Sequence, residues 1–157
     1  MLEATGFQML LNRWVQVRPG LIISGIEDLT TNHRKGLSSD PLSKALDHRP
    51  PGATILLSHT PWQVERAADK GVGLMLSGHT HAGQIWPFSY LVNHYYPFFS
   101  GRYELPGMTA IVSRGAGTWG PRMRLWHPGE ILRITLHPKK GLTGCSECFF
   151  EQDSSRS

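Results

Sequence analysis

Two short apolar runs that close on histidine decide the fold: Ala53-Thr54-Ile55-Leu56-Leu57-Ser58-His59 and Val72-Gly73-Leu74-Met75-Leu76-Ser77-Gly78-His79-Thr80-His81. A continuous apolar run of this length is typical of a strand buried on both faces of a sheet. Between the runs, Thr60-Pro61-Trp62-Gln63 has the pattern of a capping box with proline at the first helical position, and Gly71 is a helix terminator. The order strand, helix, strand predicts two parallel strands joined by a right-handed crossover.

Three histidines follow these strands at the edge where open α/β sheets bind ligands. His59 ends the first strand, and His79 and His81 end the second. Residues two apart on extended backbone point to the same side, so we expect His79 and His81 to converge and His59 to reach the same place. Neutral imidazole is a common ligand of zinc and iron. The spacing predicts a transition-metal site; structural or incidental histidines are the alternative.

Outside this unit, the pattern predicts more strands and one aromatic segment. A short helix is predicted over 2–12, and a helical turn over Pro41 to Leu46 with Asp40 as its N-cap. Gln84 to Phe99 predicts a long loop with a helical turn. Strands are predicted over 14–17, 21–26, 101–105, 108–113 and 130–136. We expect one domain over residues 1–137 and a polar, disordered tail over 138–157.

The composition excludes several classes of protein. With 39% hydrophobic and 18% charged residues among 157, the chain is globular rather than disordered. The formal net charge of +4 is scattered along the chain, which argues against a nucleic-acid site. No apolar run reaches the roughly 20 residues that a membrane helix needs, and no signal-peptide pattern follows Met1. The two cysteines exclude a disulfide-dense scaffold but leave the compartment open.

Three stretches together resemble the calcineurin-like metallophosphoesterases. The first two are Ile55 to Pro61 and Leu74 to Gln84, with the Gly-His-x-His motif at 78–81. The third is Val112-Ser113-Arg114-Gly115-Ala116-Gly117-Thr118-Trp119-Gly120-Pro121-Arg122, followed by 129–131 and 134–136. The third stretch is similar to the subgroup that is often preceded by membrane helices or a twin-arginine signal. The resemblance covers roughly residues 21 to 136.

The resemblance implies the C-terminal half of a four-layer αββα sandwich, an α/β fold with a mixed sheet and flanking helices. It implies that His59 and His79 bind one metal and that His81 binds a second, which makes all three metal ligands and catalytic residues. Two divalent ions (Mn, Fe or Zn) in the intact enzyme would share a hydroxide that attacks phosphorus in line. The expected function is therefore metal-dependent phosphoester hydrolysis, with Arg114 and Arg122 as candidate substrate-binding residues.

Three motifs that the family carries earlier in its chain are absent: Asp-x-His, Gly-Asp and Gly-Asn-His. Three neutral imidazoles cannot offset the charge of two dications, so we expect this chain alone to bind at most one ion well. An active enzyme would then need an N-terminal half in trans, and membrane association is expected of the full-length protein. The alternatives are an inactive fragment or metal-binding partner module, and a hydrolase with a single zinc ion on His59, His79 and His81.

Four further features carry weaker signals. Gly115 to Gly120 matches G-x-G-x-x-G, but Pro121 follows where a nucleotide site needs a helix, which favours a close-packed turn. Cys145 and Cys148 form a C-x-x-C without the second pair of a zinc site. The aromatic residues between Trp86 and Phe99 are expected to form core or a lid, with contact to a lipid-like substrate or a membrane as the alternative. Asp28 follows a predicted strand and could approach the site.

Overall fold

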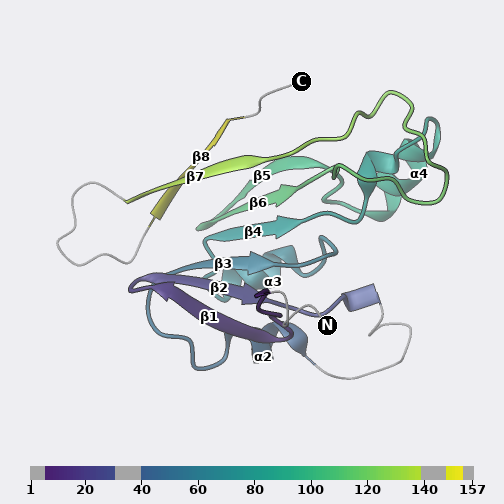
Figure 1. The fold of residues 1–157 in the computed structure, drawn as a ribbon. Coiled ribbons are helices and arrows are strands. Elements are labelled where there is room, and N and C mark those ends of the chain that lie inside the picture. The colour runs from purple at the N-terminus through teal and green to yellow at the C-terminus, as the bar shows by residue number, and fades with distance from the viewer. Residues whose placement is uncertain (1–5, 31–39, 139–147, 154–157) are drawn as a thin grey trace.

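A six-stranded mixed sheet forms the centre of the protein (Figure 1). The computed structural model describes residues 6–30, 40–138 and 148–153. The sheet has the order β1-β2-β3-β4-β6-β5, in which β2, β3, β4 and β6 are parallel and the edge strands β1 and β5 are antiparallel to their neighbours. Its strands are β1 (Arg13–Arg18), β2 (Leu21–Gly25), β3 (Ala53–Leu57), β4 (Leu74–Ser77), β5 (Gly101–Leu105) and β6 (Met108–Val112). The predicted α/β class is confirmed.

The two apolar runs form the middle of this sheet. β3 pairs with β4 in parallel, with Ile55 opposite Leu74, as the strand-helix-strand order predicts. Alternate side chains go to opposite faces, so Leu56 and Met75 enter one core cluster while Ile55 and Leu74 enter the other. Both faces are therefore apolar in these strands, which explains why their sequence is a continuous apolar run.

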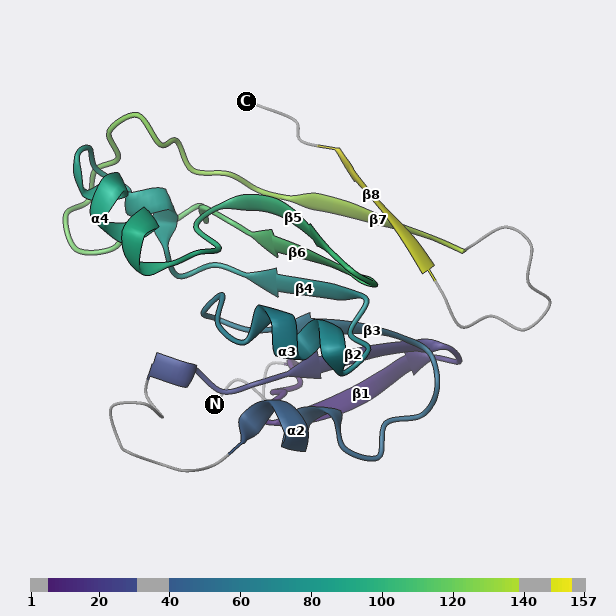
Figure 2. The ribbon, with the colours of Figure 1, turned by 180° about the vertical axis from the view of Figure 1, so that it is seen from behind.

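Two helices cover one face of the sheet, α2 (Pro41–Leu46) and α3 (Val64–Asp69), as Figure 2 shows. The Asp40 side chain accepts a hydrogen bond from the Ser43 backbone N–H, so the predicted N-cap of α2 is confirmed. The predicted capping box at the start of α3 is wrong. Gln63 has a left-handed backbone with φ of 60° and no side-chain cap.

The helix starts late because the chain before it is held in an irregular turn. The Ser58 hydroxyl donates to the carbonyl of Thr60 over 2.7 Å, and the Gly78 N–H donates to the carbonyl of His59 over 3.1 Å. These bonds keep His59 at the end of β3 and prevent Thr60 from starting a helix. The predicted end is confirmed, since Lys70 is the C-cap and Gly71 follows with φ of 73°.

A second pair of strands lies across the other face. β7 (Arg133–Pro138) pairs antiparallel with β8 (Cys148–Asp153), and Leu132, Ile134 and Leu136 pack against the core cluster of Leu21, Ala53, Ile55, Leu74 and Ile111. The predicted strand at 130–136 thus starts three residues later. Cys145 and most of the predicted tail lie outside the described residues, and the proposed boundary at residue 137 stays a prediction.

The predicted helix over 2–12 is wrong for residues 6–12, which contain no helix; residues 2–5 lie outside the described part of the chain. Leu10 packs over the end of β2, where a Cβ atom on Gly25 would meet the Leu10 carbonyl oxygen at 2.5 Å. This contact holds the segment across the sheet. Within the described residues, no helix is long and apolar enough to cross a membrane.

The predicted aromatic loop contains a two-turn helix. A 3-10 turn, η2 (His81–Gly83), leads to α4 (Phe88–Tyr95), which lies beyond the C-terminal ends of β4 and β6 (Figures 1 and 2). The segment after β6 lies at the same end of the sheet. Both segments therefore flank the edge where the histidines were predicted to gather.

Candidate functional site

The candidate site lies at the C-terminal ends of three adjacent parallel strands. Asp28 follows β2, His59 follows β3 and His79 follows β4. Each strand contributes one polar side chain beyond its last paired residue, because parallel strands end at a common edge. Residues separated by 20 positions or more in the sequence thus become neighbours.

His59 and His79 are in direct contact. His59 Nε2 lies 2.9 Å from His79 Nδ1, and the two rings meet edge to face with centroids 4.8 Å apart. On its other side, His79 Nε2 lies 2.9 Å from the hydroxyl of Tyr96. Tyr96 is stacked on Trp62, with an interplanar angle of 19°. A stacked aromatic ring therefore fixes the hydroxyl that orients His79.

His79 and His81 do not have the extended backbone that was predicted. His79 has φ of 69° and His81 has φ of 49°, both left-handed, although His59 and His81 are close enough to His79 to lower its pKa. With Ala82 and Gln84 also at positive φ, this short segment has four residues in a region that side chains rarely adopt. Such strain concentrates at functional sites, where the surrounding structure must hold it.

Arg124 is the residue that meets His81. One guanidinium nitrogen lies 3.3 Å from His81 Nδ1, and the other donates to the carbonyl of His81 at 3.4 Å. The same guanidinium donates to the carbonyls of Arg114, at 2.8 Å, and of Gly115, at 3.1 Å. A guanidinium only donates hydrogen bonds, so His81 Nδ1 is an acceptor in this arrangement. Arg124 thus ties the segment after β6 to the Gly-His-x-His motif.

Both histidines of the motif are kept neutral by their surroundings. Burial lowers the pKa of His79, and the neighbouring His59 and His81 lower it further, while Asp28 acts in the opposite direction. Burial also lowers the pKa of His81, with the Arg124 charge adding to the effect. Neutral imidazole is the form that ligates metals. The local electrostatics therefore favour a metal ligand over a cationic histidine.

Asp28 is the carboxylate at this edge. Burial raises its pKa, but hydrogen bonds from the Thr30 hydroxyl and backbone N–H, together with the charges of His59 and His79, outweigh that effect and lower it. The side chain is therefore ionised at neutral pH. It places a negative charge within electrostatic reach of the histidine pair, where a bound cation would be stabilised.

The loop after the motif is fixed by Gln84. Its side-chain amide donates to the carbonyls of Trp119 and Pro121, and its Oε1 accepts from the Trp119 N–H at 2.6 Å. The Gln84 side chain is almost fully buried. These three hydrogen bonds satisfy its amide group, whose burial without partners would destabilise the fold. The 114–131 segment is thereby held beside the motif.

The two predicted substrate-binding arginines occupy different surroundings. Arg114 forms an ion pair with Glu130: its Nε and one terminal nitrogen both donate to Oε2, at 3.0 and 2.8 Å, and its backbone N–H donates to Oε1 at 2.7 Å. Arg122 is exposed in the same segment. Arg114 is therefore committed to anchoring the segment, and the substrate role of both arginines stays a prediction.

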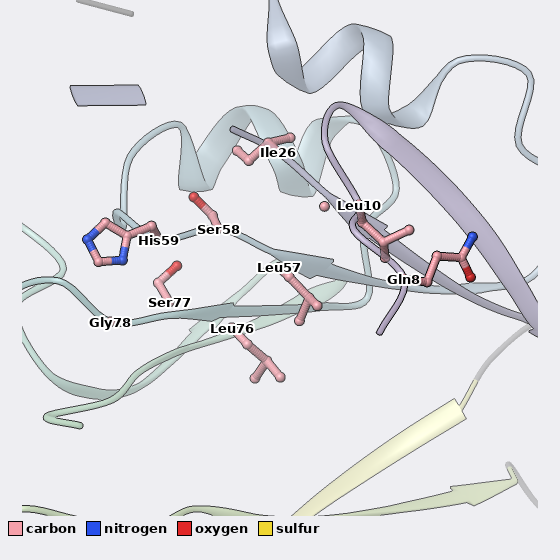
Figure 3. Close-up of a pocket in the computed structure, with 10 residues that line it drawn as sticks. Gln8, Leu10, Ile26, Leu57, Ser58, His59, Leu76, Ser77 and Gly78 are labelled. Carbon is pink, nitrogen blue, oxygen red and sulfur yellow. The ribbon is translucent and has the colours of Figure 1, made fainter. Parts of the chain in front are cut away.

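An open cavity of about 490 Å³ lies beside His59. Figure 3 shows that its walls differ from end to end, with His59, Ser58 and Ser77 at one end and Leu10, Leu57 and Leu76 towards the other. The Ser77 hydroxyl is buried and has no hydrogen-bond partner among the described residues.

The residues fit one metal ion better than two. Two imidazole nitrogens on one tetrahedral zinc ion, each about 2.0–2.1 Å from it, stand about 3.3 Å apart. The 2.9 Å between His59 Nε2 and His79 Nδ1 is close to that separation. In the described part of the chain, however, no group of three His, Cys, Asp or Glu side chains is arranged to hold an ion. Among the described residues His81 is not part of such a group, and its Nδ1 faces Arg124.

The sequence did not single out Tyr96 or Arg124. Tyr96 is one of several aromatic residues in its segment, and Arg124 resembles Arg122 two positions earlier. Only the packing of Trp62 and the left-handed turn at His81 distinguish them. No local pattern in the sequence would have identified either residue.

Comparison with known proteins gives a consistent set of relatives. The chain is 42% identical over 123 residues to an uncharacterized metallophosphoesterase of Helicobacter pylori, an alignment that covers 76% of this chain and 33% of that protein. An uncharacterized metallophosphoesterase of Campylobacter jejuni is 38% identical over 138 residues, covering 87% and 36%. A transmembrane protein with a metallophosphoesterase domain from Bos taurus is 38% identical over 144 residues, covering 86% and 30%.

The chain spans about a third of the length of these relatives. No protein-family model matches it, and no solved structure matches it.

Proposed function

Because the chain belongs to the calcineurin-like metallophosphoesterases, we propose that it supplies part of a dinuclear metal site for hydrolysis of phosphoesters. The observation that carries the proposal is the His59–His79 pair, with two imidazole nitrogens 2.9 Å apart at the ends of adjacent parallel strands. A divalent metal would supply Lewis acidity and a hydroxide at neutral pH.

Each residue of the site has a defined part in this proposal. His59 and His79 are the ligands of one ion, since His59 Nε2 and His79 Nδ1 already lie 2.9 Å apart. The Tyr96 hydroxyl orients His79 through its Nε2, as partners of metal-bound histidines commonly do. Asp28 contributes negative charge that offsets part of the charge of the cation.

His81 would have to bind a metal through Nε2, or through Nδ1 after Arg124 has moved away. In the arrangement described, Arg124 occupies the direction of its Nδ1. The second ion therefore depends on ligands from outside the described residues, in keeping with the absence of Asp-x-His, Gly-Asp and Gly-Asn-His. We propose that a further segment of polypeptide supplies these ligands in the active enzyme.

A second candidate function is a metal-binding partner module without activity of its own. For the chain alone, the structure favours this second function, because the described residues contain one histidine pair and no third ligand beside it. The two functions differ in metal stoichiometry and in turnover. The partner module binds one ion per chain and hydrolyses nothing, whereas the enzyme needs two.

The test combines calorimetry with an activity assay. Titration of the chain with Mn²⁺ or Zn²⁺ is expected to give one ion per chain, and His79→Ala is expected to abolish that binding. The matched control is His94→Ala, because His94 is exposed on α4 and alanine preserves the helix. Equal binding by both variants would refute the ligand assignment.

Activity is measured as hydrolysis of an aryl phosphate with added Mn²⁺. Turnover that is lost in His79→Ala and kept in His94→Ala supports an enzyme. Binding of one ion without turnover supports the partner module. Tight binding of two ions by the chain alone would contradict the proposed dependence on further ligands.

A further inference from the structure

The helix α4 exposes the apolar side chains that a helix normally buries. Phe88, Leu91 and Tyr95 stand at positions i, i+3 and i+7, which places them on one side of the helix, and all three are largely exposed. Ser89, a small residue, is where this helix approaches the rest of the protein most closely. A Cβ atom on Gly83 would lie 2.3 Å from Ser89 Cα, so the helix contacts η2 through Ser89.

A second segment extends this apolar surface. Trp86 lies against Trp126 with ring centroids 5.5 Å apart, and the Leu125 N–H donates to the carbonyl of Gln84 over 2.9 Å. Trp119 is held by the Gln84 side chain and is 76% exposed, and Trp126 is 72% exposed. We call this surface the aromatic face, and it consists of Trp86, Phe88, Leu91, Tyr95, Trp119 and Trp126.

The six side chains of the aromatic face are all large, apolar and exposed to water. Monomeric proteins rarely expose contiguous apolar patches of more than a few hundred Å², and larger ones mark interaction sites. Figures 1 and 2 both place α4 and the segment after β6 together, beyond the C-terminal ends of β4 and β6. The face thus lies at the same end of the sheet as the histidine pair.

The charges around the aromatic face have one sign. Neither residues 84–99 nor residues 115–129 contain an aspartate or a glutamate, while Arg122 and Arg124 lie in the second segment. Tryptophan and tyrosine beside arginine are the residues enriched where proteins enter the interfacial zone of a bilayer. Arg122 is exposed and would meet anionic headgroups while the rings enter the boundary of the acyl chains, whereas the guanidinium of Arg124 is engaged with backbone carbonyls.

We propose that the aromatic face binds the surface of an anionic phospholipid bilayer and holds the histidine pair close to it. A second copy of the chain is a poorer occupant, because a two-fold contact would bring Arg122 of one face towards Arg122 of the other, and residues 84–99 and 115–129 contain no carboxylate to pair with them. The binding is peripheral: the rings enter the interfacial zone and no segment spans the bilayer.

Sedimentation with phosphatidylglycerol–phosphatidylcholine vesicles tests the proposal. The chain is expected to co-sediment with these vesicles, to bind pure phosphatidylcholine less, and to be released as salt increases. Leu91→Ser is expected to weaken partitioning about tenfold, since it removes one large apolar side chain from the inserted surface. Arg122→Gln is expected to weaken it about fivefold.

The matched control is Leu11→Ser. Leu11 is 61% exposed, similar to Leu91 at 68%, and it lies outside the aromatic face, next to the edge strand β1. It is expected to leave partitioning unchanged. Quenching by brominated lipid gives a second readout, which Trp126→Phe should reduce and Trp14→Phe should not. Circular dichroism confirms that each variant is folded.

Three results would overturn the proposal. The first is that the folded chain does not sediment with anionic vesicles. The second is that Leu91→Ser and Leu11→Ser partition alike. The third is a concentration-dependent dimer, seen without lipid and lost in Leu91→Ser, which would assign the aromatic face to a second copy of the chain.

Discussion

At the scale of single residues, the site depends on backbone that side chains disfavour. Four non-glycine residues from His79 to Gln84 have positive φ, and Gly83 is a fifth with φ of 72°. The Thr80 hydroxyl stabilises this turn by donating to the carbonyl of Phe99 over 2.7 Å. Hydrogen bonds and close packing thus hold conformations that cost of order 1–3 kcal/mol each when isolated.

The first prediction concerns Gly83. Gly83→Ala is expected to lower the free energy of unfolding by about 1–3 kcal/mol, because its Cβ atom would overlap the Ser89 backbone on α4. Gly117→Ala is the control, since nothing lies within 4 Å of its Cβ position and its φ is ordinary. Urea unfolding of both variants measures the difference, and equal stability would contradict the close approach of η2 and α4.

The second prediction separates the ring of Tyr96 from its hydroxyl. Tyr96→Phe removes the contact to His79 Nε2 and is expected to cost about 1 kcal/mol. Tyr96→Ala also removes the stack on Trp62 and is expected to cost a further 0.5–1.5 kcal/mol or so, beyond the lost buried area. Chemical denaturation compares the two. If Tyr96→Phe and Tyr96→Ala lower the free energy of unfolding equally, the stack on Trp62 does not hold Tyr96 in place.

At the scale of elements, the helices are short, and their stability depends on capping residues and on packing against the sheet. α2 has six residues, too few for a helix that is stable by propensity alone, so its cap and its buried face decide whether it forms. Leu42 and Ala45 are fully buried against the sheet. Asp40 caps the first turn and also pairs with Arg66 of α3 over 2.7 Å. The cap therefore joins the two helices that cover one face of the sheet.

The third prediction concerns this cap and its dependence on pH. The hydrogen bond from the Ser43 hydroxyl is the largest cause that lowers the pKa of Asp40 from 3.8 to about 2. Burial opposes it, and Arg66 and the Ser43 backbone N–H add to the lowering. A carboxyl whose pKa is lower in the folded state stabilises fully above its unfolded value and loses that contribution as pH falls. The Asp40 contribution is therefore complete above about pH 4 and fades towards pH 2.

Asp40→Ala is expected to cost about 1 kcal/mol near neutral pH, mostly from the lost cap. Because the Asp40 side chain is 41% exposed, solvent screens its pair with Arg66 and that pair adds little. The free energy of unfolding of the wild-type protein and of Asp40→Ala is measured at pH 7, 4 and 2. The difference between the two is expected to shrink as the pH falls to 2. A difference that stays constant down to pH 2 would contradict the assignment.

At the scale of the whole molecule, one sheet aligns strand ends that lie far apart in the sequence. β2, β3 and β4 are parallel and in register, so the residues that follow them share one edge. The segment after β6 then closes on that edge through Arg124 and through the Arg114–Glu130 pair. The site is thus a product of the complete sheet.

The fourth prediction follows from burying two histidines at this edge. Burial, assisted for His79 by His59 and for His81 by Arg124, lowers both pKa values below 6.5. As pH falls below 6.5, the unfolded chain takes up these protons before the folded one, so the free energy of unfolding decreases. Without metal, stability is expected to be greatest above pH 6.5 and to fall below it.

Unfolding in the presence of a chelator, between pH 7.5 and 5, checks this expectation. His79→Gln should reduce the change in the free energy of unfolding with pH. His94→Gln, the exposed control, should leave that change as it is in the wild-type protein. An equally steep dependence in His79→Gln would show that the proton uptake occurs elsewhere in the chain.

The sequence alone determined the parallel pair of strands and the presence of histidines at their ends. It could do so because a strand buried on both faces needs a continuous apolar run, and that run marks its own boundaries at Ser58 and Ser77. The N-cap at Asp40 was predictable for a similar reason, since capping needs only residues within one turn.

The tertiary structure decided how these residues are directed. The left-handed backbone at His79 and His81, the contact of Arg124 with His81 and the placement of Tyr96 against His79 all depend on segments 17 to 43 residues apart. The start of α3 was mispredicted because hydrogen bonds from Ser58 and Gly78 overrode a local capping pattern. Local patterns report local energies, whereas the direction of a side chain at a sheet edge is set by whatever packs against it.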